Sequence, residues 1–157
     1  MTLTNIRPDL SEADGSWSAV PPRLLVTGSR DWSDERSVRN ALFTAYGWLG
    51  VRGLLLVGRP TAVTLVHGNA NGLDRIAGGI AAEWHWDVEV HPALWQVHGK
   101  SAGPIRNSEM VLAGANLCLA FPLPRPGGGK SGTQDCYEKA LDAGIPTWIF
   151  PARRMGQ

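Results

Sequence analysis

The stretch NLCLAFPLPRPGGGKSGTQD, residues 116–135, joins an apolar run to a polar, glycine-rich loop. The apolar run has the composition of a buried strand, and helical spacing resumes at about Thr133 and continues to Ala143. Glycine lets a backbone approach a ligand closely, and successive backbone N–H groups that open into a helix bind anions. This stretch therefore predicts a strand, a phosphate-binding loop and a helix.

The same alternation of strand and helix continues along the rest of the chain. Apolar residues at helical spacing predict helices over about 34–49, 73–84 and 105–112, the first capped by Ser33, and VRGLLLVGRP (51–60) is a helix end or a loop. Short apolar runs predict strands in RLLVTGSR, TAVTLVHG, DVEVHP, NLCLAFP and PTWIF. The predicted fold class is α/β, a single Rossmann-like domain whose five-stranded, mainly parallel sheet carries helices on both faces.

The length of 157 residues favours one domain with its own core. The beginning, MTLTNIRPDLSEADGSWSAVPP, lacks a basic segment followed by an apolar one, so it does not resemble a secretory signal. Its polar composition predicts a flexible tail over 1–22, followed by the Rossmann-like domain over 23–157.

Charge and cysteine content limit the classes of partner that we expect. A net charge of +1 predicts no duplex nucleic acid partner, and no run approaches the roughly 18 apolar residues of a membrane span, so no membrane partner is expected either. Cys118 and Cys136 lack the spacing of metal ligands. We therefore expect reduced thiols in a cytoplasmic protein with no metal and no cofactor.

Three polar, glycine-rich turns follow predicted strands: TGSRDW, HGNANGLD and FPLPRPGGGKSGTQD. In parallel sheets, ligands lie beyond the carboxyl ends of the strands, at the switch point in strand order. The dinucleotide fingerprint is absent after the first strand, and the P-loop form at Gly129-Lys130-Ser131 has Pro124 in place of its first glycine. A P-loop NTPase stays a third alternative behind a binding protein and a hydrolase.

Four motifs in order carry a resemblance over Arg23 to Phe150: RLLVTGSRDWSD, VHGNANGLDRIA, AGPIRNSEM and GGGKSGTQD with ALDAGIPT. They resemble the YspA-type branch of the SLOG superfamily, which is related to the LOG proteins, phosphoribohydrolases of nucleoside monophosphates. The resemblance implies a Rossmann-like fold that binds, and in some settings senses, a nucleotide or nucleotide-derived ligand. LOG relatives pair through helices, so a homodimer is compatible with the resemblance.

The LOG motif is only partly present. Arg106-Asn107 stands where the family has Arg-Lys, and two additional residues separate Pro126-Gly127-Gly128 from Gly132-Thr133. The family's catalytic glutamate falls on Cys136, and the nearest carboxylate, Asp135, lies about 100° away around a helix. Because a thiol cannot stabilise an oxocarbenium-like centre as a carboxylate does, a binding protein is the first interpretation. The alternative is a LOG-like phosphoribohydrolase that cleaves the N-glycosidic bond of nucleoside 5'-monophosphates with Arg106 and Asp135.

The predicted ligand is a phosphorylated, nucleotide-derived small molecule. Its phosphate is expected across Gly28-Ser29 and the Gly127–Thr133 loop, with Arg106 reaching toward that loop, and its ribose or base near His67. His67 and Arg106 also have ordinary structural interpretations, and Trp32 and Trp95 either stack a base or pack. The predicted ligand-binding residues are Gly28, Ser29, Arg30, His67, Gly68, Asp74, Arg106, Asn107, Gly127, Gly128, Gly129, Lys130, Ser131, Gly132 and Thr133.

Overall fold

The computed structural model describes residues 20–55 and 62–152, and five strands within these ranges form one sheet. Its order is β3-β2-β1-β4-β5, and every neighbouring pair is parallel. The prediction of a Rossmann-like α/β fold is confirmed. The strands are β1 (Arg23–Gly28), β2 (Thr64–His67), β3 (Asp87–Val90), β4 (Leu117–Phe121) and β5 (Thr147–Ile149).

Two regions of the sequence predictions lie outside the described residues. Most of the predicted tail falls on residues 1–19, and VRGLLLVGRP extends into residues 56–61. The part of VRGLLLVGRP that the structure describes contains the end of a helix at Val51.

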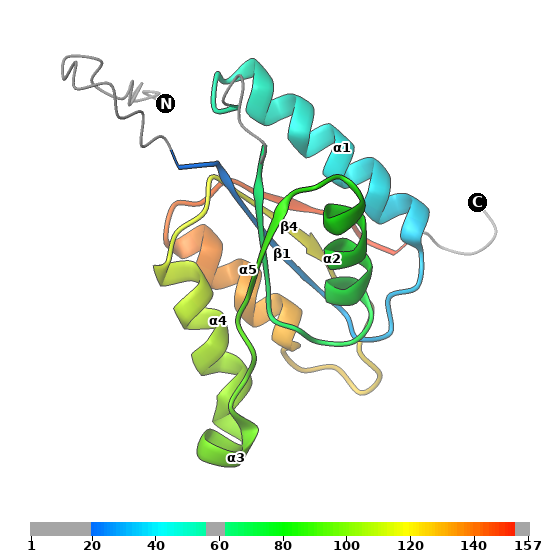
Figure 1. The fold of residues 1–157 in the computed structure, drawn as a ribbon. Coiled ribbons are helices and arrows are strands. Elements are labelled where there is room, and N and C mark those ends of the chain that lie inside the picture. Colours follow the sequence, from blue (N-terminus) through cyan, green and yellow to red (C-terminus); the bar gives the residue numbers. More distant parts are fainter. Residues whose placement is uncertain (1–19, 56–61, 153–157) are drawn as a thin grey trace.

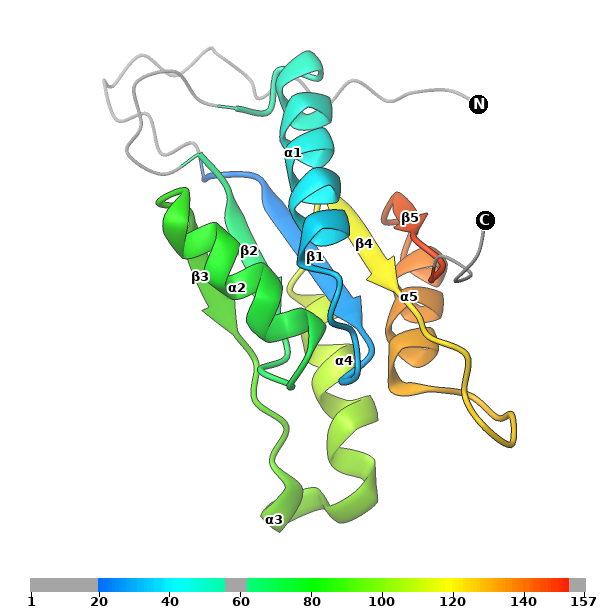
Figure 2. The ribbon, with the colours of Figure 1, turned by 90° about the vertical axis from the view of Figure 1, so that its right-hand side faces the viewer.

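Helices cover both faces of the sheet (Figures 1 and 2). α1 (Glu35–Val51) and α2 (Leu73–Glu83) pack on one face, and α4 (Ala102–Leu112) and α5 (Gly132–Asp142) pack on the other. Helices cover β4 on both faces, so it is buried along its whole length. Burial on both faces accounts for its continuous apolar run. The residues that α1 buries are those that helical spacing predicted: Val38, Ala41, Leu42, Ala45 and Leu49.

The structure corrects the sequence predictions at two helix starts and adds two short helices. The N-cap of α1 is Asp34 rather than Ser33, because the Asp34 carboxylate accepts a hydrogen bond from the backbone N–H of Ser37 at 3.1 Å. α4 begins at Ala102, earlier than predicted. The two short helices that were not predicted are α3 (Trp95–His98) and η1 (Gly99–Ser101). Neither buries a residue, so the sequence has no apolar periodicity there from which a helix could be predicted.

The order of the strands decides where a ligand can lie. From β1 the chain builds the sheet outward through β2 and β3, and then returns to place β4 on the other side of β1. The loops that leave β1 and β4 therefore turn to opposite faces of the sheet, and a crevice opens between them at their carboxyl ends.

Candidate functional site

A cleft of about 760 Å³ lies at the carboxyl ends of β1 and β4, where the sequence predicted a binding site. Four segments line it: the β1–α1 loop, the β2–α2 loop, the stretch from α3 to α4, and the β4–α5 loop. In Figure 2, these segments gather at the lower end of the sheet, toward which the strand arrows point.

The structure brings most of the predicted site residues to this cleft, but not all of them. His67 and the glycines of the loop tip, Gly127 to Gly129, are not among the residues that line it. The predicted residues that line it are Gly28, Ser29, Arg30, Gly68, Asp74, Arg106, Asn107, Lys130, Ser131, Gly132, Thr133 and Asp135.

The beginning of α5 provides open backbone N–H groups. Ser131 is the N-cap, and its hydroxyl accepts a hydrogen bond from the backbone N–H of Gln134 at 3.1 Å. The N–H groups of Gly132 and Thr133, one residue and two residues into the helix, have no acceptor within a helix. Both residues line the cleft, so these N–H groups and the positive end of the helix dipole are suited to an anion there.

The three glycines of the loop tip have a conformational role instead. The φ angles of Gly127, Gly128 and Gly129 are 78°, 73° and 87°, a backbone conformation that favours glycine. All three are exposed and do not line the cleft. They shape the turn that carries the chain from β4 back to α5.

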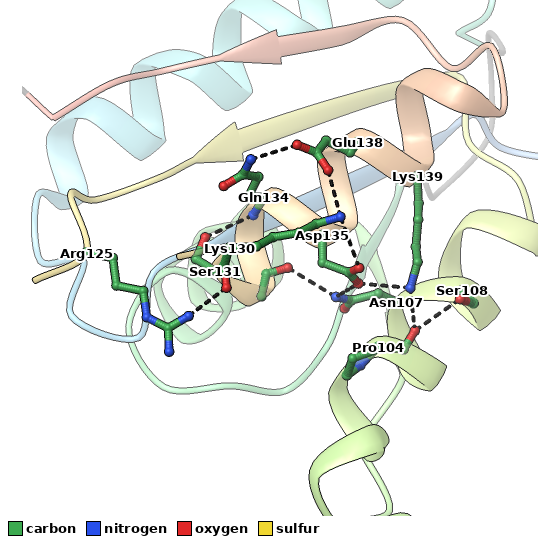
Figure 3. A network of polar contacts seen from close by, with 11 residues as sticks. Pro104, Asn107, Ser108, Arg125, Lys130, Ser131, Gln134, Asp135, Glu138 and Lys139 are labelled. Carbon is green, nitrogen blue, oxygen red and sulfur yellow. Dashed lines mark hydrogen bonds and ion pairs between the residues drawn. The ribbon is translucent and has the colours of Figure 1, made fainter. Parts of the chain in front are cut away.

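Asn107 connects α4 to the beginning of α5 (Figure 3). Its Nδ2 donates to the carbonyl oxygen of Gly132 at 3.1 Å and to the Asp135 carboxylate at 3.0 Å, and its Oδ1 accepts from Nε of Arg106 at 2.9 Å. Asn107 is 2% exposed. This buried amide fixes the position of the α5 N-terminus relative to α4.

The Asp135 carboxylate is already hydrogen-bonded to other residues of the protein. Its carboxylate accepts from Asn107 and from Nζ of Lys139 at 2.9 Å. Burial acts to raise the pKa of Asp135, but the hydrogen bonds from Asn107 and Lys139 outweigh it and lower the pKa. The neighbouring Cys136 is fully buried, and burial raises the pKa of its thiol to about 11. At neutral pH this pair therefore consists of a bound carboxylate and a neutral thiol.

Lys130 lines the cleft but is held by carboxylates of α5. Its Nζ lies 2.7 Å from Oε2 of Glu138 and 3.7 Å from Oδ1 of Asp135. The Arg125 guanidinium donates to the carbonyl oxygen of Lys130 at 2.6 Å, which closes the loop on itself (Figure 3).

Arg106 lies against the β2–α2 loop, which corrects the expectation that it reaches toward the loop of residues 127–133. Its Nη1 donates to the carbonyl oxygen of Gly68, and the carbonyl oxygen of His91 is 3.5 Å away. The carbonyl at the end of β2 attracts the guanidinium, because a buried backbone oxygen needs a donor. In the described part of the chain, Arg106 has no carboxylate within ion-pair distance, so its charge remains available to a ligand.

The backbone N–H groups of the β2–α2 loop donate hydrogen bonds to side chains of the same region. The Asp74 carboxylate accepts from Gly68 and Ala70, each at 3.1 Å, and Nδ1 of His67 accepts from Asn69 at 3.0 Å. Burial raises the pKa of Asp74 to about 6, although these hydrogen bonds act to lower it. Burial, with the charges of Arg106 and His91, lowers the pKa of His67 and keeps its ring neutral. These N–H groups of the β2–α2 loop are therefore not free to bind an anion.

Trp95 and Lys100 also line the cleft; the sequence left Trp95 open between stacking on a base and packing, and it did not single out Lys100. Trp95 is 49% exposed, and the guanidinium carbon of Arg30 lies 5.5 Å from its ring centroid. A second cavity of about 290 Å³ adjoins the cleft at Arg30, Trp95 and Arg106. α3 has no apolar periodicity, so its tryptophan was the only feature of the sequence that could have indicated a place in the site. Trp32, by contrast, is buried against Phe121.

The fold and the cleft together define a Rossmann-like protein with a cation-lined cleft at the switch point of its sheet. A family model described as "YspA, cpYpsA-related SLOG family" matches residues 22–98. The Gene 61 protein of Mycobacterium phage D29 is 41% identical over 137 residues, which are 82% of this chain and 95% of that protein. The chain belongs to the YspA, cpYpsA-related SLOG family.

The solved structure of DNA processing protein A (DprA) from Streptococcus pneumoniae shares the fold, with a TM-score of 0.59 and 15% sequence identity. The similarity covers 87% of this chain and 52% of that one, so the chain spans about half of its length. The expectation of no duplex nucleic acid partner is wrong, because a protein with this fold is named for DNA processing. A net charge is an average over the chain and does not describe the cations gathered in one cleft.

Within residues 20–55 and 62–152, no helix has the length and apolar character that crossing a membrane requires. In the same ranges, no group of three or more His, Cys, Asp and Glu side chains is arranged to hold a metal ion.

The buried carboxyl of Asp74 predicts a specific dependence of stability on pH. Because its pKa is raised from 3.8 to about 6, protonation stabilises the fold, and this contribution is lost as pH rises through 6. Asp74→Asn cannot titrate but keeps an oxygen for the loop N–H groups. Between pH 7 and pH 5, the free energy of unfolding of the wild type should gain about 1 kcal/mol relative to Asp74→Asn. Urea unfolding at several pH values measures this difference, and a constant difference contradicts the prediction.

Proposed function

We propose that the cleft binds a nucleotide or nucleotide-derived ligand through its phosphate. The observation that carries this proposal is that the open N–H groups at the start of α5 line the same cleft as the Arg106 guanidinium, which has no carboxylate partner among the described residues. A phosphate between them would receive backbone hydrogen bonds on one side and a charge-assisted, two-point contact on the other. In this proposal, the anion lies across Gly28-Ser29 and the backbone from Ser131 to Thr133.

The sugar and base of the ligand are proposed to lie toward the β2–α2 loop. The N–H groups of Gly68, Asn69 and Ala70 are already bonded to Asp74 and His67, so this wall offers few donors to an anion. It offers instead the half-exposed ring of Trp95, a flat surface against which an aromatic base can pack.

The hydrolytic alternative receives less support from the site. A phosphoribohydrolase needs a carboxylate that is free to act at the sugar, whereas Asp135 is bound to Asn107 and Lys139. Cys136, at the position of the family's glutamate, is buried as a neutral thiol. Likewise, the P-loop alternative needs a lysine that reaches phosphates, and Lys130 is paired with Glu138.

A thermal-shift experiment tests binding against turnover. Nucleoside 5'-monophosphates should raise the unfolding temperature without release of free base, because the site holds the phosphate but lacks an available catalytic carboxylate. At a hundredfold excess over the dissociation constant, linkage predicts about 2.7 kcal/mol of added stability. The matched nucleosides, which lack the phosphate, are the control and should give little shift.

Two results would contradict this proposal. Equal shifts by nucleosides and their monophosphates would show that the phosphate is not the anchor. Release of free base, detected by chromatography and lost in Asp135→Asn, would make the phosphoribohydrolase the better assignment.

Several sequence predictions remain predictions at this stage. They are the domain extending over residues 23–157, the cytoplasmic location and the homodimer. Size-exclusion chromatography with light scattering, with and without a nucleoside monophosphate, tests the homodimer directly.

A further inference from the structure

One oxygen of Asp74 is open toward the cleft. Asp74 is 5% exposed and lines the cleft from the first turn of α2. Its Oδ2 accepts both loop hydrogen bonds, from Gly68 and Ala70. No buried side-chain nitrogen or oxygen in the described residues lacks a partner. Because Oδ1 has no hydrogen bond to any described residue, it must reach solvent, and the cleft is the space that Asp74 lines.

The surroundings of this oxygen restrict what it can bind. The charged groups that act on the Asp74 carboxyl are the guanidinium groups of Arg106 and Arg30, which also line the cleft. An ionised phosphate has no proton to donate to a carboxylate and is repelled by it. A ligand ammonium group is disfavoured by the two arginines. A neutral donor beside an anion meets neither obstacle, and a sugar hydroxyl is such a donor.

We propose that Oδ1 of Asp74 binds a hydroxyl of the sugar, so that the cleft prefers ribose phosphates to 2-deoxyribose phosphates. This inference rests on the proposed binding of a phosphorylated, nucleotide-derived ligand. A carboxylate oxygen has two lone pairs and can accept from both hydroxyls of a vicinal diol. Removal of the 2-hydroxyl destroys the diol and leaves a desolvated acceptor without one of its donors.

The experiment compares ribose 5-phosphate with 2-deoxyribose 5-phosphate by isothermal titration, because these probes require no knowledge of the base. Inorganic phosphate measures the affinity of the anion site alone. The wild type is expected to bind the ribose compound about tenfold more tightly than the deoxyribose compound, as one charge-assisted hydrogen bond provides. This comparison uses the unaltered protein and does not depend on the folding of a variant.

Two variants assign the preference to Asp74. Asp74→Asn keeps an oxygen for the loop N–H groups but turns an amide donor toward the cleft, so the ratio of the two affinities should fall to about one. Asp31→Asn removes an exposed carboxylate that also lines the cleft, and it should keep the tenfold ratio. A preference that persists in Asp74→Asn would overturn the assignment to Asp74.

The outcomes separate this inference from the proposed function. Equal affinity of the wild type for the two sugar phosphates, with measurable binding of both, overturns the inference and leaves the phosphate site standing. Absence of binding by inorganic phosphate and by both sugar phosphates overturns the proposed function and this inference with it.

Discussion

Gly72→Ala is expected to reduce the free energy of unfolding by at least about 3 kcal/mol, because two independent features require glycine there. Gly72 is the N-cap of α2, with φ 69° and ψ −120°, a conformation that L side chains rarely adopt. A Cβ at this position would also overlap the backbone of Ser29 and Arg30. The close approach of the β1–α1 and β2–α2 loops thus depends on the absence of a side chain.

The β1–α1 loop has little freedom to move away. The carbonyl oxygen of Ser29 accepts hydrogen bonds from the backbone N–H groups of Trp32 and Leu73, each at 3.2 Å, and the N–H of Ser29 donates to Phe121 at 3.1 Å. A shift that relieves the overlap would break these bonds. The same shift would displace one wall of the cleft, so phosphate binding should fall together with stability.

Gly79→Ala is the matched control for this prediction. Gly79 lies in the same helix, on its exposed side, and a Cβ there meets nothing within 4 Å. Alanine should stabilise α2 by about 0.5–1 kcal/mol, since glycine loses more conformational freedom on folding. Urea unfolding of both variants gives the comparison. A loss of less than about 1 kcal/mol in Gly72→Ala would show that the two loops can separate without strain.

Arg106→Ala is expected to weaken binding of nucleoside monophosphates ten- to hundredfold, because it removes a charge-assisted contact that contributes on the order of 1.5–3 kcal/mol. Arg106→Lys should recover only part of the affinity, since an ammonium group cannot make a planar two-point contact. Stability without ligand should fall by about 1 kcal/mol, because the carbonyl oxygen of Gly68 and Oδ1 of Asn107 lose a donor.

Lys130→Ala is the matched control for Arg106. Lys130 also lines the cleft, but its charge is already satisfied by Glu138 at 2.7 Å. Its removal should change the affinity less than about threefold, as for an exposed ion pair of low net energy. Titration calorimetry on the folded variants measures both effects. If Arg106→Ala binds as tightly as the wild type, Arg106 serves only to hold the β2–α2 loop.

Several features of this protein follow from the sequence because they depend on local spacing. The buried positions of α1, from Val38 to Leu49, repeat at the period of a helix, and a continuous apolar run identified β4 as a covered strand. The glycine-rich turns after β1, β2 and β4 were expected at one edge of the sheet, because carboxyl ends of parallel strands share an edge. The position of the cleft could be predicted on this basis, whereas the family was predicted from the resemblance of four motifs.

The partners of the side chains in the cleft were decided by the tertiary structure. Arg106 contacts Gly68, 38 residues away, and Asn107 contacts Asp135, 28 residues away. Neighbouring residues of one helix thus contact different elements, the β2–α2 loop and the beginning of α5, a division that helical spacing alone does not assign. Trp95 likewise reached the cleft through a short helix with no apolar pattern. Local periodicity encodes which face of a helix or strand is buried. The contacts between segments far apart in the sequence depend instead on the order of the strands in the sheet, which brings those segments together.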